Sequence, residues 1–185
     1  MTSMFAERLR KLREIKEVDK AVAPERAAEQ GYRVGEFWKA ALELKAAALT
    51  YFKPILDTVS SVYLNGAGRF NIYPDEDSIS GKGGWTQTYT EQKLNGPHAY
   101  IELKWDIVYL GSGHSGKSLL IRLGEGGKID FMPGYQSVKT DLIRITDDDW
   151  KSRLEQLIVS AIETGEVAFY HDEDTDILEK AETRD

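Results

Sequence analysis

The chain has 185 residues, of which 41% are hydrophobic and 30% are charged, a composition typical of one globular domain with a sizeable core. It contains no cysteine, so disulfides, thiolate metal sites and a cysteine nucleophile are excluded. The net charge of −7 arises at the C-terminal end, where residues 147–185 hold 4 basic and 13 acidic side chains; an acidic chain without a basic stripe argues against nucleic acid as a partner.

The sequence shows no membrane or export signal. No apolar run approaches the roughly 20 residues that a membrane helix needs. Glu7, Arg8 and Arg10 lie where a signal peptide would carry its apolar core. We therefore expect a soluble, cytoplasmic protein with no membrane partner.

Residues 1–31 are expected to form a helical arm. Between residues 4 and 22, apolar side chains recur at steps of three or four and make one stripe on a charged helix: Phe5, Leu9, Leu12, Ile15, Val18 and Val22. Residues 23–25 predict a break, with Pro24 in the first turn of a second, short helix that Gly31 ends. The arm either packs on the body of the protein or pairs with another chain, in which case the first three residues of the stripe belong to the interaction surface.

The body, residues 32–171, is expected to be an α+β domain. Its strongest helical pattern runs from Gly35 to Val59, where apolar side chains recur at helical steps and several alanines favour a helix. Pro54 must kink this helix or begin a new turn, because proline lacks the N–H that a helix interior needs. We expect this helix to lie across a sheet.

From Ser61 the apolar period changes to two, which predicts an antiparallel meander of about six strands with the helices packed on one face. The expected strands are 62–73, 85–93, 98–110, 117–123, 128–132 and 138–145. A last helix, capped by Thr146 and ended by Gly165, precedes an expected edge strand at 167–170. Residues 172–185 are expected to form an acidic, flexible tail.

The segment from Gly111 to Ser118 matches the phosphate-binding pattern GxxxxGK[ST]. In a nucleotide site, Gly111 and Gly116 would shape the loop, Lys117 would neutralise phosphates and Ser118 would reach the metal. Such a loop connects a buried parallel strand to the N-terminus of a helix. A helix after Lys117 would therefore support the nucleotide site, and a strand would argue against it.

The neighbouring residues favour a turn over a nucleotide site. The preceding strand carries Glu102, Lys104 and Asp106 on one face, which indicates an antiparallel strand with a face in water. Residues 119–123 are too few for a helix before a glycine-rich turn, and no second acidic motif appears that could hold magnesium. We interpret residues 111–116 as a flexible six-residue turn between two strands.

No other residues make a recognisable site. The three histidines, His98, His114 and His171, are not in metal-ligand spacing with one another, so we expect no metal site and no cofactor. A calcium-loop resemblance at residues 75–77 fails at its later ligand positions. No serine has an obvious histidine partner, and the sequence gives no catalytic constellation.

Aromatic residues recur at a period of two along two expected strands. Trp85 and Tyr89 share one face, and so do Trp105 and Tyr109. We expect these faces to form core beneath the long helix, with an exposed binding surface as the alternative. The opposite face, which includes Glu102, would then lie in water.

The leading functional hypothesis is a soluble, non-enzymatic binding or adaptor protein that acts on another protein, or on a second copy of itself, through the N-terminal arm. It rests on the amphipathic arm, the charge asymmetry and the lack of a catalytic constellation in the sequence. One alternative is a nucleotide-binding protein that uses Lys117. Another is a small-molecule binder with a pocket between the sheet and the 35–59 helix.

Overall fold

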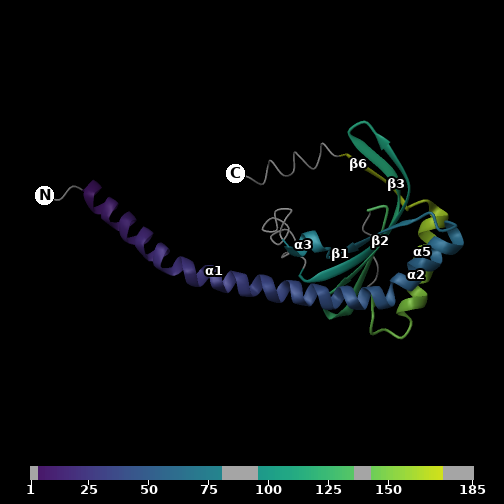
Figure 1. The fold of residues 1–185 in the computed structure, drawn as a ribbon, viewed down its shortest axis with the longest axis horizontal. Coiled ribbons are helices and arrows are strands. Elements are labelled where there is room, and N and C mark those ends of the chain that lie inside the picture. The colour runs from purple at the N-terminus through teal and green to yellow at the C-terminus, as the bar shows by residue number, and fades with distance from the viewer. Residues whose placement is uncertain (1–3, 81–95, 136–142, 173–185) are drawn as a thin grey trace. The chain divides into compact units, whose positions relative to one another are not determined.

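A single helix, α1, runs from Met4 to Tyr51 in the computed structural model, which describes residues 4–80, 96–135 and 143–172 (Figure 1). The predicted break at 23–25 and the predicted helix end at Gly31 are wrong, because the 48-residue helix continues through Pro24 and both following glycines. Alanines before and after Pro24 have a high helix propensity, which offsets part of the free-energy cost of the proline and the glycines inside the helix. Residues 1–39 and residues 40–185 form two separate compact units.

The end of α1 is followed by two short helices. Helix α2 spans Lys53–Thr58 with Pro54 in its first turn, so the proline begins a new turn as predicted. A π-helix, η1, follows at Val59–Tyr63. The predicted strand from residue 62 is therefore wrong over its first half, because Asn65 and Gly66 have φ angles of 51° and 81° and turn the chain. Only its second half forms a strand.

Within the described residues, the sheet has six antiparallel strands, which confirms the predicted fold class. Their order is β1-β2-β3-β4-β5, and β6 pairs with β3. The strands are β1 Arg69–Tyr73, β2 His98–Leu110, β3 Gly113–Gly124, β4 Lys128–Pro133, β5 Ile143–Arg144 and β6 Ala168–Asp172. The predicted strand at 85–93, most of the one at 138–145 and nearly all of the acidic tail lie outside the described residues.

Strand β3 holds the sheet together because it has partners along its whole length. Its first half pairs with β6 and its second half with β4, while β2 lies along its other edge. Ser118 is the junction: its N–H donates to the Val167 carbonyl at 2.8 Å, and its carbonyl accepts from Gly134 N at 3.0 Å. This residue therefore lies at the centre of the sheet.

The predicted six-residue turn at 111–116 is wrong. Leu110 pairs with Gly113, so only two residues connect β2 to β3. Gly113 and Gly116 lie within the strand, where another chain segment passes close by: a Cβ on Gly113 would lie 2.6 Å from the His171 carbonyl oxygen, and one on Gly116 would lie 3.2 Å from the Phe169 ring. These two glycines permit close strand and side-chain packing instead of a wide turn.

Helices cover one face of the sheet, and the core lies beneath them. Helix α5, Trp150–Thr164, lies beside α2 (Figure 1). Gly165 ends α5 with a φ of 77°, as predicted, but Asp149 and not Thr146 occupies its N-cap position. The core includes fully or almost fully buried side chains from the helical segment and the central strands: Ala48, Phe52, Leu56, Ala99, Ile101, Leu103, Leu119, Ile121, Ile129, Phe131 and Leu154.

Two short helices lie at the borders of the sheet. Helix α3 covers Glu76–Ser80, directly after β1, and a 3-10 helix, η2, makes the predicted glycine-rich turn at Glu125–Gly127 between β3 and β4. Within the described residues, no helix combines the length and the apolar content that a membrane crossing requires.

Candidate functional site

The segment that matches the phosphate-binding pattern does not have the geometry of a phosphate loop. Residues 117–123 belong to β3, so no helix N-terminus follows Lys117. The Lys117 ammonium donates to Asp106 Oδ2 at 2.9 Å, and Ser118 is fully buried. The glycine-rich sequence is explained by the two-residue hairpin turn after Leu110 and by the close packing at Gly113 and Gly116. Ser118 serves as the junction between β4 and β6.

A β-bulge in β2 separates two aromatic residues that the sequence placed on one face. The pairing register shifts between Trp105 and Val108, and Asp106 within the bulge has a φ of 52°. The prediction that Trp105 and Tyr109 share a face is therefore wrong, because the extra residue inverts the alternation beyond it. Trp105 belongs to the core at 4% exposure, as the preferred interpretation had it, whereas Tyr109 is 76% exposed.

The remaining predicted surface residues cannot be placed in the same detail. Trp85 and Tyr89 lie outside the described residues. Phe5, Leu9 and Leu12 lie on the helical backbone of α1, within the unit formed by residues 1–39. The structure therefore does not bring the predicted aromatic residues together into one patch within the part of the chain that it describes.

The face of the sheet opposite the helices contains a buried ion pair. Glu102 was predicted to lie in water, and this is wrong, because the residue is only 2% exposed. Its carboxylate is 3.2 Å from the Lys104 ammonium, and Oε2 accepts a bond of 3.4 Å from the Asn71 amide. Glu102 Oε1 and the Ser118 hydroxyl are both buried without a hydrogen-bond partner among the described residues. The alternation along the strand correctly predicted that Glu102 lies on the face opposite the helices, but it did not predict that this residue is buried there.

Aromatic hydroxyls surround this ion pair. Burial lowers the pKa of Lys104, but a hydrogen bond with Tyr135 and the charge of Glu102 outweigh this effect, so the pKa is raised overall. Burial, and then the charge of Glu102, raises the pKa of Tyr100. The lysine therefore stays charged and the tyrosine stays neutral near pH 7. In this cluster, the charge of Lys104 lies next to the Glu102 carboxylate.

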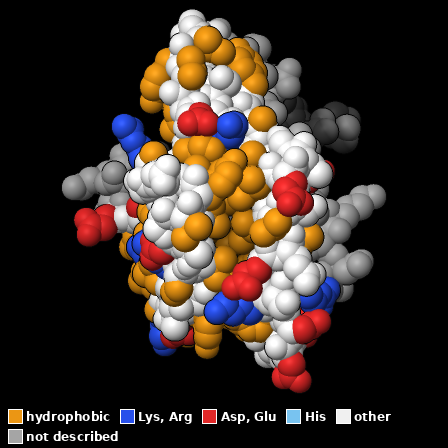
Figure 2. All heavy atoms as spheres, turned by 90° about the vertical axis from the view of Figure 1, so that its right-hand side faces the viewer, with side chains coloured by type: hydrophobic (Ala, Val, Ile, Leu, Met, Phe, Trp, Pro, Cys, Tyr) orange, Lys and Arg blue, Asp and Glu red, His pale blue; other side chains and the backbone are white. Residues whose placement is uncertain are grey.

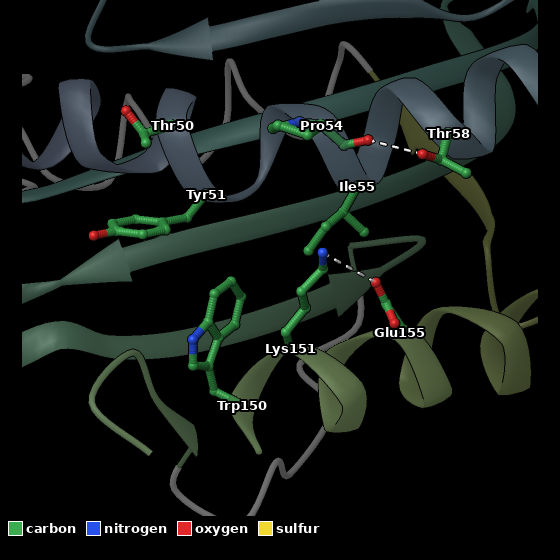
Figure 3. Close-up of a pocket in the computed structure, with 8 residues that line it drawn as sticks. All are labelled: Thr50, Tyr51, Pro54, Ile55, Thr58, Trp150, Lys151 and Glu155. Atoms are coloured by element: carbon green, nitrogen blue, oxygen red, sulfur yellow. Dashed lines mark hydrogen bonds and ion pairs between the residues drawn. The ribbon is translucent and has the colours of Figure 1, made fainter. Parts of the chain in front are cut away.

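A shallow groove of about 270 Å³ lies on the helical side of the body. On the face shown in Figure 2, hydrophobic side chains run down the middle, with charged side chains to either side of them. Tyr51 and Ile55 point into the groove from one side, and Trp150 and Lys151 from α5 point into it from the other (Figure 3). The rings of Tyr51 and Trp150 meet edge to face at 5.9 Å.

The groove is not the helix–sheet pocket that the small-molecule alternative requires. It lies between helices, at the end of α1, along α2 and beside α5. Beneath it, Phe52 and Leu56 are fully buried in the core and fill the space between the helices and the sheet. This arrangement gives the small-molecule alternative no support.

Among the described residues, no group of three or more histidine and acidic side chains is arranged to hold a metal ion. Comparison with known proteins adds no assignment: no family model, no curated protein and no solved structure matches this chain.

Proposed function

We propose that this protein is a non-enzymatic binding protein that associates with another protein chain, most simply a second copy of itself, through its N-terminal helix. The observation that carries this proposal is the separate unit formed by residues 1–39, which is a single helix. The described part of that unit, residues 4–39, contains no second element on which an apolar face could pack. A helix–helix contact with another chain would bury the stripe that begins at Phe5.

The composition of α1 supports the need for such a contact. Pro24 costs about 3 kcal/mol relative to alanine inside a helix, and Gly31 and Gly35 cost about 1 kcal/mol each. Isolated helices are marginally stable in water even without such residues. Packing of the apolar stripe against a second helix offsets these costs, because burial of each large apolar side chain contributes roughly 1.5–3 kcal/mol.

The charge of the arm is compatible with pairing between two copies. Residues 1–39 hold 9 basic and 7 acidic side chains, so the arm is close to neutral. Two copies therefore meet little net repulsion, unlike the strongly acidic C-terminal ends. The described charged side chains Lys11, Arg13 and Lys16 are exposed, which leaves them in water at the surface of the helix.

The test measures the molar mass of the full chain by light scattering after size-exclusion chromatography. We expect a dimer for the unmodified chain and a monomer for the double variant Leu9→Glu, Leu12→Glu, which places charge in the apolar stripe. The matched control is Lys11→Glu, which introduces the same residue at an exposed position on the side of the helix away from Leu9 and Leu12, and it should stay dimeric. A monomeric unmodified chain, or equal masses for both variants, would contradict self-association.

A nucleotide titration tests the alternative. On the proposed function, ATP or GTP with Mg²⁺ leaves the melting temperature unchanged, because a ligand stabilises a protein only if it binds the folded state. A clear rise in melting temperature that Lys117→Ala abolishes would favour the nucleotide alternative over the proposed one.

A further inference from the structure

Two histidines lie opposite each other where the β2–β3 hairpin extends beyond the bulge. His114 of β3 and His171 of β6 are direct partners in the antiparallel register. Paired residues project from the same face of a sheet, so both imidazoles stand side by side. Their ring centroids are 5.1 Å apart with an angle of 61° between the ring planes.

Aromatic rings border the pair. The Phe169 ring meets the His114 ring edge to face, with the ring centroids 5.8 Å apart. Tyr109 lies on β2, the other strand that pairs with β3, and its ring centroid is 6.0 Å from that of His114. His114 Nδ1 is buried and has no hydrogen-bond partner among the described residues. A buried polar atom normally has a partner, so this nitrogen points to an interaction that the described protein groups do not supply.

The ring separation matches the geometry of two imidazoles on one metal ion. A Zn–N bond is about 2.0–2.1 Å long, and a ring centroid lies roughly 1.1 Å behind the nitrogen, which places each centroid about 3.2 Å from the metal. At a tetrahedral angle, the two centroids are then about 5.2 Å apart. The observed separation of 5.1 Å is close to this value.

We propose that His114 and His171 together bind a divalent transition-metal ion of the kind that prefers imidazole, such as Zn²⁺, Ni²⁺ or Cu²⁺. The two histidines supply two ligands, and water or a residue of a bound partner completes the coordination. Because one ligand lies on β3 and the other on β6, the metal ties the end of β6 to the hairpin. Both ligands belong to the unit formed by residues 40–185.

No pattern in the sequence indicates this pair. His114 and His171 are 57 positions apart, and only the pairing of β6 with β3 brings them together. Spacing along the chain detects metal ligands within one turn or one helix, not ligands that meet across strands.

The test is calorimetric titration of the tag-free full chain with ZnCl₂ and, separately, with NiCl₂. We expect saturable binding of one ion per chain in the micromolar range, and a loss of at least about tenfold in affinity in His114→Gln and in His171→Gln. The matched control is Tyr170→Phe, a neighbour on β6 that projects from the opposite face, and it should bind as the unmodified chain does. Circular dichroism of each variant confirms that it folds.

A second measurement keeps the proposal testable if one variant is poorly folded. Zn²⁺ should raise the melting temperature of the unmodified chain, since a ligand that binds the folded state stabilises it, and should not raise that of the double histidine variant. Saturable binding that persists in the double variant would place the site elsewhere, and absence of saturable binding to the unmodified chain would also overturn the proposal.

Discussion

The arm and the body contain the same helical pattern but use it differently. In the body, the apolar side of the helix ends in a core, where Phe52 and Leu56 are fully buried against the sheet. In the unit formed by residues 1–39, the stripe lies on a single helix, and the described residues of that unit form no second element. Apolar residues at steps of three or four therefore predict a helix in both regions. They do not predict which other element packs against the apolar side of that helix.

The largest expected effect concerns the core of the body. Phe52→Ala should lower the free energy of unfolding by about 3–5 kcal/mol, because it leaves a cavity among side chains that are fully buried. Chemical denaturation monitored by tryptophan fluorescence measures this loss. Leu42→Ala, at an exposed position of α1 within the same unit, is the control and should cost far less. A loss below about 1 kcal/mol would show that the core is packed differently.

The second effect concerns the buried ion pair. Lys104→Met leaves the Glu102 carboxylate buried without its counter-charge and should lower the free energy of unfolding by about 2–3 kcal/mol. This loss is smaller than for a fully buried pair, because the lysine side chain is 25% exposed. The double variant Lys104→Met, Glu102→Met should regain much of that stability. If the double variant is no more stable than the single one, the pair is not the unit of stability that the structure indicates.

The third effect separates the arm from the body. Pro24→Ala should stabilise the helix by up to about 3 kcal/mol and so tighten self-association, without changing the unfolding of the body. Concentration-dependent sedimentation gives the dissociation constant, and thermal unfolding reports on the body. A change in body stability with unchanged association would mean that this segment serves the body instead.

The smallest effect is a pH dependence that comes from His98. Burial lowers the pKa of His98 below its ordinary value of 6.5, although a hydrogen bond to the Gly96 carbonyl opposes this. As the pH falls, His98 is therefore protonated at a higher pH in the unfolded chain than in the folded one. Its contribution to the free energy of unfolding is fully present above about pH 6.5 and declines as the pH falls below that value. His98→Phe keeps a ring beside Tyr73 and should flatten this decline in pH-dependent denaturation. An unchanged decline would assign it to other groups.

Much of the body could be predicted from the sequence, because the spacing of apolar residues distinguishes a helix from a strand. Strand β2 was predicted with its observed bounds, His98–Leu110, and Gly165 was predicted to end α5. The continuity of α1 through Pro24 could not be predicted, because local rules for proline favour a break and its neighbours decide otherwise.

The candidate sites were harder to predict, because each depends on contacts between distant segments. Alternation placed Glu102 on the face opposite the helices but could not show that the residue is buried there. The bulge at Asp106 inverts the outer half of β2, and no local signal distinguishes it from a regular strand. For the same reason, Tyr109 was placed on the wrong face, and the cross-strand pair of His114 and His171 was missed.

The association of two arms can be measured directly with a spin label. The chain has no cysteine, so Lys11→Cys, at an exposed position of α1 away from the stripe, carries one label per chain. In a helix pair, the axes lie about 8–10 Å apart, which keeps labels on two copies within the range of pulsed dipolar spectroscopy. The proposed function predicts a defined distance between labels that disappears in Leu9→Glu, Leu12→Glu. The absence of any dipolar coupling in the unmodified arm, at concentrations well above those of the mass measurement, would contradict it.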